Sequence, residues 1–274
     1  MNTTSAVVTG GGRGIGLAIA ARLAAAGHRV LITDIDGEAA AKAAREIGRG
    51  AVGMQQDVRD IGGHRDVATR AAALGELTIW VNNAGILIAG DSWTHEDDEL
   101  AAILEINIRG ALAGSNAAVQ AMGAKGGRIL NIASISALAP VPGLAVYAAT
   151  KAAVLSFTTS LQGDLDHAGL PIKVKALCPD VVGTQMVSDR VGDPGAAMLF
   201  AGPKPLDADA VAKAGLDLLE SRQVFSVVPR WRGVVARTTD VAPTLGLAAL
   251  AVMRKLGDRA QAKGMRLGAK ENSK

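Results

Sequence analysis

The sequence predicts a single α/β domain built on a doubly wound, seven-stranded parallel sheet, followed by a basic helical extension. Two observations lead to this fold class. Short apolar runs rich in β-branched residues alternate with longer runs rich in Ala and Leu, and strands that are apolar throughout and separated by helices are typical of a parallel sheet covered on both faces. The first apolar run also leads directly into a glycine-rich turn, as in the first strand–helix unit of such sheets.

Predicted strands and helices alternate from the N-terminus to residue 230. The seven strands are predicted at 5–9, 29–33, 51–55, 78–81, 127–133, 172–177 and 224–228. The six helices between them are predicted at 15–26, 37–48, 60–74, 97–123, 145–168 and 207–221. No repeat, linker or low-complexity block interrupts this order, so we expect one domain over 1–230 and an extension over 231–274.

The composition is that of a globular protein with a substantial core. The chain has 274 residues, 49% of them hydrophobic, and one cysteine, Cys178. A single cysteine allows no internal disulfide, which favours a reducing, cytoplasmic location. The N-terminus enters a predicted strand without the features of a signal peptide, and no apolar run reaches the ~18 residues of a membrane span.

Charge is distributed unevenly along the chain. The net charge is +3, but residues 222–274 hold 11 Lys and Arg against 3 Asp and Glu, and the rest of the chain is mildly acidic. A basic tail can bind nucleic acid or an anionic membrane. Aromatic side chains that stack on bases are nearly absent from this tail apart from Trp231, so we do not expect nucleic acid as a partner.

The glycine-rich turn reads T-G-G-G-R-G-I-G at 9–16. Gly10, Gly14 and Gly16 allow a tight turn and a close approach of the backbone to a pyrophosphate, whose charge a helix N-terminus attracts. A lone turn of this kind is weak evidence. Here a strand precedes it, a helix follows it and a second strand comes next, which is the context that the motif requires. The turn therefore predicts a dinucleotide site.

The end of the second predicted strand indicates which dinucleotide is bound. Asp34 lies 24 residues after Gly10, where a carboxylate can accept hydrogen bonds from both hydroxyls of an adenosine ribose and would repel a 2′-phosphate. Arg13 argues the other way, because a cation in the turn could bind that phosphate. We expect the acid to dominate, which favours NAD over NADP; the alternative role for Asp34 is a helix cap or turn acid.

Tyr147 is the only tyrosine in the chain and stands four residues before Lys151, in Y-A-A-T-K. Positions i and i+4 of a helix share one face, with Cβ atoms ~5–6 Å apart. A cation beside a phenol favours its ionised form, so the pair could take part in proton transfer. In isolation, such a pair is more often a surface tyrosine stacked along a lysine stem.

Together, the turn and the Tyr-Lys pair resemble the short-chain dehydrogenase/reductase family over roughly residues 5–230. Further family motifs follow in order: Asp57–Val58 after the third predicted strand, N-N-A-G at 82–85 after the fourth, and Asn107 in the long helix. Ser134 precedes Tyr147 by 13 residues, which is the usual interval in the family. In the family, N-N-A-G lies over the adenine ribose and the residues matched by 57–58 contact adenine.

The resemblance implies a Rossmann fold with defined site residues. The catalytic residues would be Asn107, Ser134, Tyr147 and Lys151. The residues that would bind NAD are Gly10, Arg13, Gly14, Ile15, Gly16, Asp34, Asp57, Val58, Asn83, Ala84, Gly85, Tyr147, Lys151, Pro179, Val182 and Thr184.

The roles implied by the resemblance are those of a hydride-transferring enzyme. Such a reaction needs a base for the alcohol proton, or an acid in the reductive direction. Tyr147 would serve, with its pKa of ~10 lowered by Lys151 and by the positive charge of oxidised nicotinamide. Lys151 would also bind the ribose hydroxyls, Ser134 would donate to the substrate oxygen, and Asn107 would anchor a water that links Lys151 to solvent. Ser136 is a rival of Ser134, but the interval to Tyr147 favours Ser134.

One segment departs from the family pattern. After the sixth predicted strand the family usually has Pro-Gly, whereas this chain reads C-P-D-V-V-G-T at 178–184. Pro179 and Thr184 match, and we expect Thr184 to reach the carboxamide or phosphates of the cofactor. Asp180 replaces the glycine, and an acid there could disturb cofactor docking or face a basic or hydroxylated substrate.

The remaining candidates indicate no metal site. The four histidines lie on predicted turns or helix surfaces outside any metal-ligand spacing. Cys178 ends a strand, and we expect a packed thiol rather than a nucleophile.

Loops after the strands form the substrate pocket in this family, here 86–90, 137–144 and 185–200. These loops are largely apolar, and none forces a Lys or Arg close to Ser134. We therefore expect a neutral alcohol or ketone rather than a phosphorylated or CoA-linked substrate.

A helix is expected at about 244–263, beyond the family core. Its apolar residues share one face and its cations gather elsewhere, as in helices that lie on anionic membranes. We nonetheless expect it to pack over the pocket, near 185–200, or against another subunit. The apolar face comprises Leu245, Ala249, Val252, Leu256 and Ala260, and the cations are Arg254, Lys255, Arg259 and Lys263.

The sequence as a whole predicts an NAD(H)-dependent oxidoreductase that interconverts a secondary alcohol and a ketone. A non-catalytic nucleotide sensor with the same fold and an NADP(H)-dependent carbonyl reductase are the alternatives; such sensors commonly lose the Tyr or the Lys, which this chain keeps. Family members usually pair their long helices, so the resemblance implies a homotetramer through 97–123 and 145–168.

Overall fold

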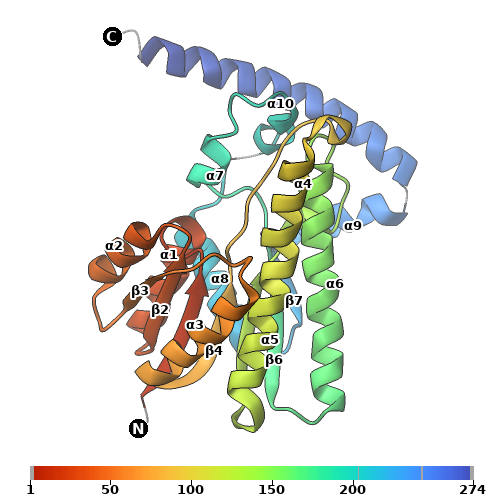
Figure 1. Cartoon of the computed structure of the whole chain (residues 1–274). Helices are drawn as coiled ribbons and strands as arrows, with labels where there is room; N and C mark the ends of the chain where they lie inside the picture. Colours follow the sequence, from red (N-terminus) through yellow and green to blue (C-terminus); the bar gives the residue numbers. More distant parts are fainter. Residues whose placement is uncertain (1–2, 203, 242, 272–274) are drawn as a thin grey trace.

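The computed structural model describes residues 3–202, 204–241 and 243–271, and shows three layers with a sheet in the middle (Figure 1). All strands are parallel, in the order β3-β2-β1-β4-β5-β6-β7. The predicted doubly wound, seven-stranded sheet of a Rossmann fold is therefore confirmed. The strands are β1 (Thr4–Thr9), β2 (Arg29–Asp34), β3 (Val52–Gln55), β4 (Glu76–Asn82), β5 (Gly127–Ile132), β6 (Ile172–Pro179) and β7 (Phe225–Val228).

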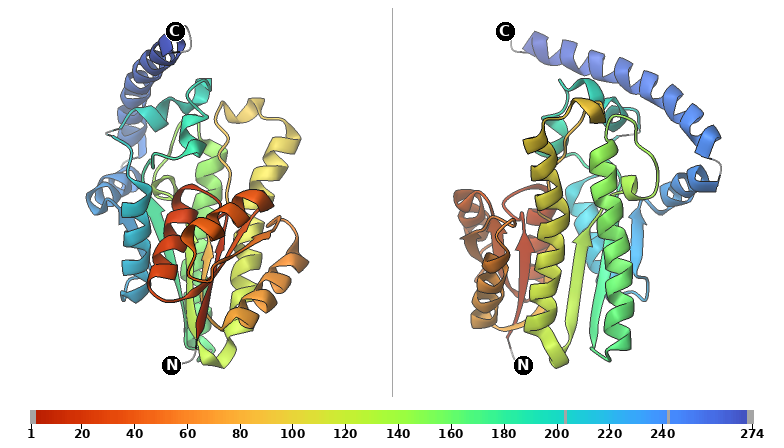
Figure 2. Two further views of the ribbon diagram at one scale, coloured as in Figure 1. Left: turned by 90° about the vertical axis from the view of Figure 1, so that its left-hand side faces the viewer. Right: turned by 45° about the vertical axis from the view of Figure 1, so that its right-hand side comes forward.

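Helices cover both faces of the sheet, which explains why its strands are apolar throughout (Figure 2). Side chains alternate between the two faces of a strand, so Val8 packs with one helical layer and Val7 with the other. One layer comprises α1 (Gly14–Ala25), α2 (Gly37–Ile47) and α8 (Ala208–Glu220). The other comprises α3 (Ile61–Leu74), α4 (Asp97–Leu104), α5 (Ala111–Met122) and α6 (Ala145–His167).

The helix predicted at 97–123 is divided. Between α4 and α5 the chain makes a π-helical stretch, η2 (Glu105–Gly110), which contains the buried Asn107. Gly110 ends this stretch against Val58, where an added Cβ would approach Val58 Cγ2 to 3.0 Å. Such π-helical insertions re-aim side chains within a helix and are frequent at functional sites. The apolar pattern continues through the insertion, so it gave no sign of the break.

The strand order reverses between β1 and β4, and the carboxyl ends of all the strands meet at one edge of the sheet. Ligands of doubly wound sheets bind outside this edge, at the reversal. Short elements lie over the edge (Figure 2). They are η1 (Ser92–Thr94), η4 (Ile135–Ala137), α7 (Gln185–Ser188) and η5 (Pro194–Phe200), while η3 (Gly123–Lys125) lies at the opposite end of the sheet, after α5.

The C-terminal extension consists of α9 (Arg230–Val241) and α10 (Pro243–Glu271). As Figure 1 shows, α10 crosses above the carboxyl edge, and its contacts are with η5 and α9. The expected helix 244–263 lies within α10 and packs near 185–200, as predicted. Among the described residues, no helix is long and apolar enough to cross a membrane.

The face of α10 that packs is not the predicted apolar face. Val252 and Leu256 are 62% and 50% exposed, and Ala260 is also exposed, while the side chains of Leu245 and Ala249 lie outside the described residues. Gly257 packs instead, so closely that an added Cβ would overlap the Ala197 carbonyl oxygen. The side-chain amide of Gln261 donates to the carbonyl oxygens of Val191 and Asp193, each at 2.8 Å. A close backbone approach and a polar anchor therefore orient the helix, rather than its largest apolar residues.

Candidate active site

A cavity of about 590 Å³ opens at the carboxyl edge of the sheet. Ser134, Tyr147 and Lys151 line it together, so the structure brings three of the four predicted catalytic residues to one place. Most of the remaining wall is apolar, and it comes from the ends of β4, β5 and β6 and from η5, α9 and α10. The cavity also contacts the predicted cofactor residues Ile15, Asn83, Gly85, Pro179, Val182 and Thr184.

Tyr147 and Lys151 lie one turn apart near the start of α6, with the lysine Nζ 5.7 Å from the centre of the phenol ring. Lys151 is buried and donates a hydrogen bond to the Ile132 carbonyl oxygen, at 3.0 Å. This bond directs the ammonium towards the end of β5, on the side of the cavity nearest the glycine turn. The surface stacking expected of an isolated Tyr-Lys pair is thus excluded.

Burial dominates the proton affinities of this pair. It raises the pKa of the Tyr147 phenol to about 12, against the effect of a hydrogen bond with Ser134. It lowers the pKa of Lys151 to about 8, because the charged ammonium loses solvation. In the protein alone, the pKa of the phenol is therefore raised rather than lowered as expected, and burial is the largest cause.

Ser134 and Ser136 differ in their hydrogen bonding. Ser134 caps the N-terminus of η4, because its hydroxyl accepts a hydrogen bond from the backbone N–H of Ser136 at 3.2 Å. The same hydroxyl is within hydrogen-bonding reach of Tyr147. The Ser136 hydroxyl is buried in the cavity wall and has no hydrogen-bond partner among the described residues.

Cys178 is fully buried, and burial raises the pKa of its thiol to about 12, consistent with a packed thiol.

Asn107 lies behind the cavity wall rather than in it. Its side-chain oxygen accepts from the Ile86 backbone N–H at 2.8 Å, and its Nδ2 donates to the Ile86 carbonyl oxygen and to Thr150 Oγ1. A Cβ added to Gly85 would lie 3.2 Å from Asn107 Oδ1 and 3.4 Å from Lys151 Nζ. The π-helical stretch thus brings Asn107 to the lysine and ties the loop after β4 to α6.

The glycine turn leaves open backbone beside the cavity. Gly10 and Gly14 have φ angles of +59° and +58°, which favour glycine. A Cβ on Gly10 would lie 2.8 Å from Ala84 Cα, and one on Gly16 would overlap the Gly10 carbonyl oxygen. Asn83 fixes the turn by donating to the carbonyl oxygens of Thr9 and Gly10. These residues fit a dinucleotide, because glycines at the N-terminus of α1 let a pyrophosphate approach the backbone closely.

Asp34 and Arg13 point to different sides of this turn. Asp34 accepts from the backbone N–H groups of Gly12, at 3.0 Å, and Asp36, at 3.2 Å. Arg13 donates to Gln185 Oε1 of α7, at 3.0 Å. Ile35 follows Asp34 directly and is exposed. The sequence analysis did not name it as a site residue. A large apolar residue just after a buried strand was the signal that could have drawn attention to it.

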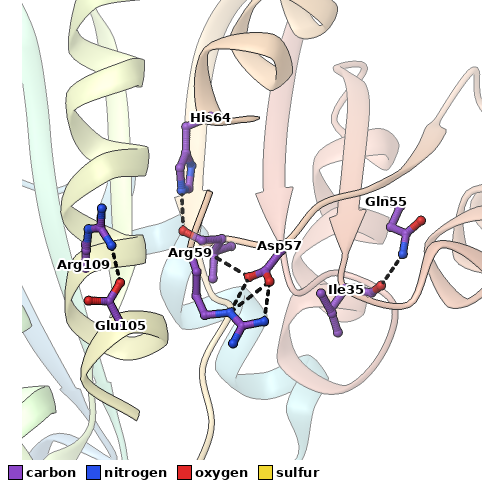
Figure 3. Close-up of polar contacts among 8 residues, drawn as sticks. Ile35, Gln55, Asp57, Arg59, His64, Glu105 and Arg109 are labelled. Carbon is purple, nitrogen blue, oxygen red and sulfur yellow. Dashed lines mark hydrogen bonds and ion pairs between the residues drawn. The ribbon is translucent and has the colours of Figure 1, made fainter. Parts of the chain in front are cut away.

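Asp57 and Val58 do not line the cavity and follow β3 in the chain; Figure 3 shows Asp57 beside Arg59. The Asp57 carboxylate accepts from the backbone N–H of Arg59 at 3.0 Å and from its guanidinium, which lowers the pKa of Asp57. The Val58 carbonyl oxygen is 2.9 Å from Nε2 of His64, whose pKa is lowered by burial. The loop is thus held by its own neighbours.

The structure also shows why an acid can replace the family glycine at 180. Asp180 forms an ion pair with Arg232 of α9, and their side chains are only 11% and 19% exposed. Both residues line the cavity, as does Lys204. Arg232 and Lys204 were missed because they lie outside the three loops considered for the pocket. The only available signal was the basic P-R-W-R segment after the last strand.

No group of His, Cys, Asp or Glu residues in the described part of the chain could hold a metal ion. The cavity brings together a phenol, a hydroxyl and a buried ammonium beside the glycine turn.

Comparisons with known proteins agree with this arrangement. The family model described as short chain dehydrogenase matches residues 4–194. The chain is 34% identical over 233 residues to 1-deoxy-11-beta-hydroxypentalenate dehydrogenase of Streptomyces avermitilis, covering 82% of this chain and 84% of that protein. It is also 34% identical over 183 residues to 3-beta-hydroxysteroid dehydrogenase of Comamonas testosteroni, covering 66% and 72%.

Solved structures show the same fold. A short chain dehydrogenase/reductase of Burkholderia phymatum, in complex with NAD, matches with a TM-score of 0.79 and 24% identity, over 89% of this chain and 95% of that one. Actinorhodin polyketide ketoreductase with NADPH matches with a TM-score of 0.71 and 30% identity, over 79% and 90%.

Proposed function

Because the chain belongs to the short-chain dehydrogenase family, we propose that it is an NAD(H)-dependent oxidoreductase that interconverts a secondary alcohol and a ketone on a neutral, largely apolar substrate. The coarser activity, oxidation or reduction at a hydroxyl or ketone, follows from membership and from relatives named as dehydrogenases. The observation that carries the proposal is the meeting of Ser134, Tyr147 and Lys151 in one apolar cavity beside the glycine turn.

The cofactor supplies the hydride acceptor or donor, and the residues of the chain move the proton. In alcohol oxidation Tyr147 accepts the proton of the hydroxyl group, while the hydride leaves the carbon that carries this group; in reduction Tyr147 returns the proton to the oxygen. Because burial raises the pKa of the phenol to about 12, the ionised form needs a nearby positive charge. Lys151 supplies one, and Ser134 donates a hydrogen bond to the substrate oxygen. Asn107 positions Lys151 and the loop after β4.

The preference for NAD rests on Asp34. Its carboxylate lies at the glycine turn, where it would accept from the ribose hydroxyls and repel a 2′-phosphate. Arg13 is occupied with Gln185, which weakens its claim as a phosphate ligand. The NADP(H)-dependent carbonyl reductase is the second candidate, because one solved relative holds NADPH. The other cofactor contacts proposed are the glycine turn with Ile15, Asp57–Val58, Asn83–Gly85, and Pro179, Val182 and Thr184.

An apolar substrate is supported by the mostly apolar cavity wall, where Asp180 and Arg232 neutralise each other.

The third alternative, a nucleotide sensor without catalysis, is disfavoured by the retained Tyr-Lys pair. We further propose a cytoplasmic homotetramer paired through α4–α5 and α6, as is usual in the family, with neither a resident metal nor nucleic acid as a partner.

The test is a panel of neutral secondary alcohols, from small to polycyclic, offered with NAD and separately with NADP and followed by the absorbance of the reduced cofactor. We expect NAD reduction that improves with apolar size, and poorer use of matched alcohols that carry a carboxylate or phosphate. A preference for NADP would favour the carbonyl reductase. NADH binding without turnover on any alcohol or ketone would favour the sensor.

A further inference from the structure

The outer face of α10, opposite to the face over the cavity, is exposed and carries both apolar and basic side chains. Leu250 and Met253 line the cavity, and Gly257 packs on η5. Residues three or four apart share a helix face, so a second set points away from the protein. This outer face comprises Ala248, Val252, Lys255, Leu256, Arg259 and Lys263, all of them exposed.

The apolar part of this face is unusual for a surface helix. Val252 and Leu256 are 62% and 50% exposed, and Leu247, at its border, is 50% exposed. The neighbouring α9 exposes Val234 as well, while its Val235 lines the cavity. Scattered apolar residues are normal on a protein surface, but a contiguous group indicates a contact with another molecule or a membrane.

The charge of the same face is positive. Lys255, Arg259 and Lys263 lie among the apolar residues, and Asp258 is the only acid among the described side chains of α10. Long basic side chains can bury their stems along apolar surface and keep their charge in water. A second copy of this face would bring like charges together, whereas an anionic surface would neutralise them.

Two of the three tryptophans are exposed on elements that contact α10. Trp231 of α9 is 60% exposed, and Trp93 of η1 is 81% exposed, whereas Trp80 is buried in the sheet. The turn that contains Trp93 contacts α10, because the Asp91 carboxylate is 3.8 Å from the Arg254 guanidinium. Tryptophan is enriched where an apolar surface meets the headgroups of a bilayer.

We propose that the outer face of α10 docks on an anionic lipid surface. The helix lies in the plane of the interface, with Val252 and Leu256 among the acyl chains and its cations at the headgroups. Each cation near such a surface strengthens binding by ~5-fold. Because the opposite face of the same helix lines the cavity, docking brings the cavity next to the lipid. Binding does not depend on the proposed reaction.

The experiment is co-sedimentation of the full chain with vesicles of phosphatidylcholine alone or with 30% phosphatidylglycerol, at low and high salt. We expect binding to the anionic vesicles only, weakened by salt. Val252→Ser with Leu256→Ser should weaken it by a factor on the order of 10, as should Lys255→Gln with Arg259→Gln. All four residues are exposed, so circular dichroism melting should show native folding.

The matched control is Ile61→Ser with Lys42→Gln, an exposed apolar residue and an exposed cation on other helices, and it should bind as the wild type does. The proposal is overturned if the wild type does not sediment with anionic vesicles at low salt. It is also overturned if the control and the face variants bind alike, or if the face variants dissociate an oligomer in light scattering, which would identify a second copy as the occupant.

Discussion

The cavity has two sides that are held in different ways. On the cofactor side, the glycine turn and the loop after β4 are fixed by backbone contacts, such as Gly16 against Gly10 and Asn83 against both the turn and β1. On the opposite side lies the cover, which we define as η5, α9 and α10. Its contacts with distant parts of the chain include the close approach of Gly257 to η5, the side-chain amide of Gln261 and the Asp180–Arg232 ion pair.

This difference separates chemistry from selectivity. Residues on the cofactor side are constrained by what the reaction and the dinucleotide require, so small changes there should alter turnover or cofactor choice. Residues of the cover form part of the cavity wall but lie outside the sheet, so changes there should alter substrate affinity while the sheet remains folded. Substitutions on the two sides can test this separation.

The largest effect is expected from Tyr147→Phe, which removes only the phenol oxygen. Turnover should fall by a factor on the order of 10² or more, because general acid–base catalysis contributes that much, while NADH binding is unchanged. Steady-state kinetics and a fluorescence titration of NADH measure the two quantities. Near-normal turnover would show that proton transfer does not pass through this residue.

Asp34→Ala should change the choice of cofactor. Loss of a charged acceptor for the ribose hydroxyls weakens NAD binding by roughly 1.5–3 kcal/mol, and loss of repulsion helps NADP. We therefore expect the ratio of kcat/KM for NAD over NADP to fall by at least about 10-fold. Asp36→Ala is the matched control, since Asp36 caps α2 and its loss should lower stability by ~1 kcal/mol without changing the ratio.

The cofactor side could be predicted from the sequence because its constraints are local. A turn such as 9–16 needs glycine wherever a Cβ would meet backbone, and the Tyr147–Lys151 spacing is fixed by helix geometry. The sheet followed from strands that are apolar on both faces. The π-helical break at Asn107 was not predictable in this way, because helix-like apolar spacing continues on both sides of it.

The cover could not be predicted because its constraints join distant residues. The side of α10 that packs is set by Gly257 and Gln261, which add little to an apolar pattern, whereas the more hydrophobic Val252 and Leu256 are exposed. The partner of Asp180 lies 52 residues further along the chain, at Arg232. The pKa values of Tyr147 and Lys151 are set mainly by burial, which sequence spacing does not reveal.

Arg232→Gln tests the ion pair of the cover. It leaves the Asp180 carboxylate without its cation in a mostly apolar wall, which should lower stability by ~3–5 kcal/mol and raise KM for an apolar substrate several-fold. Adding Asp180→Asn to Arg232→Gln should restore much of the lost stability and much of the affinity for the substrate. Arg237→Gln is the control, because Arg237 is on the same helix and stacks on Phe225. An equal effect of the two single substitutions on KM would contradict a specific role for the pair.

The smallest effect is expected from Gly257→Ala, which moves α10 without touching a cavity-lining side chain. The new Cβ would overlap the Ala197 carbonyl oxygen, so the helix must shift outward from η5. Because Leu250 and Met253 of α10 line the cavity, KM for a large apolar substrate should rise a few-fold while kcat for a small alcohol stays unchanged. Gly163→Ala is the matched control: Gly163 lies in α6, a Cβ there meets nothing within 4 Å, and removing a helical glycine should raise stability by up to ~1 kcal/mol. If both substitutions changed KM alike, the contact of Gly257 with η5 would not control access to the cavity, and the two sides would be less independent than their contacts indicate.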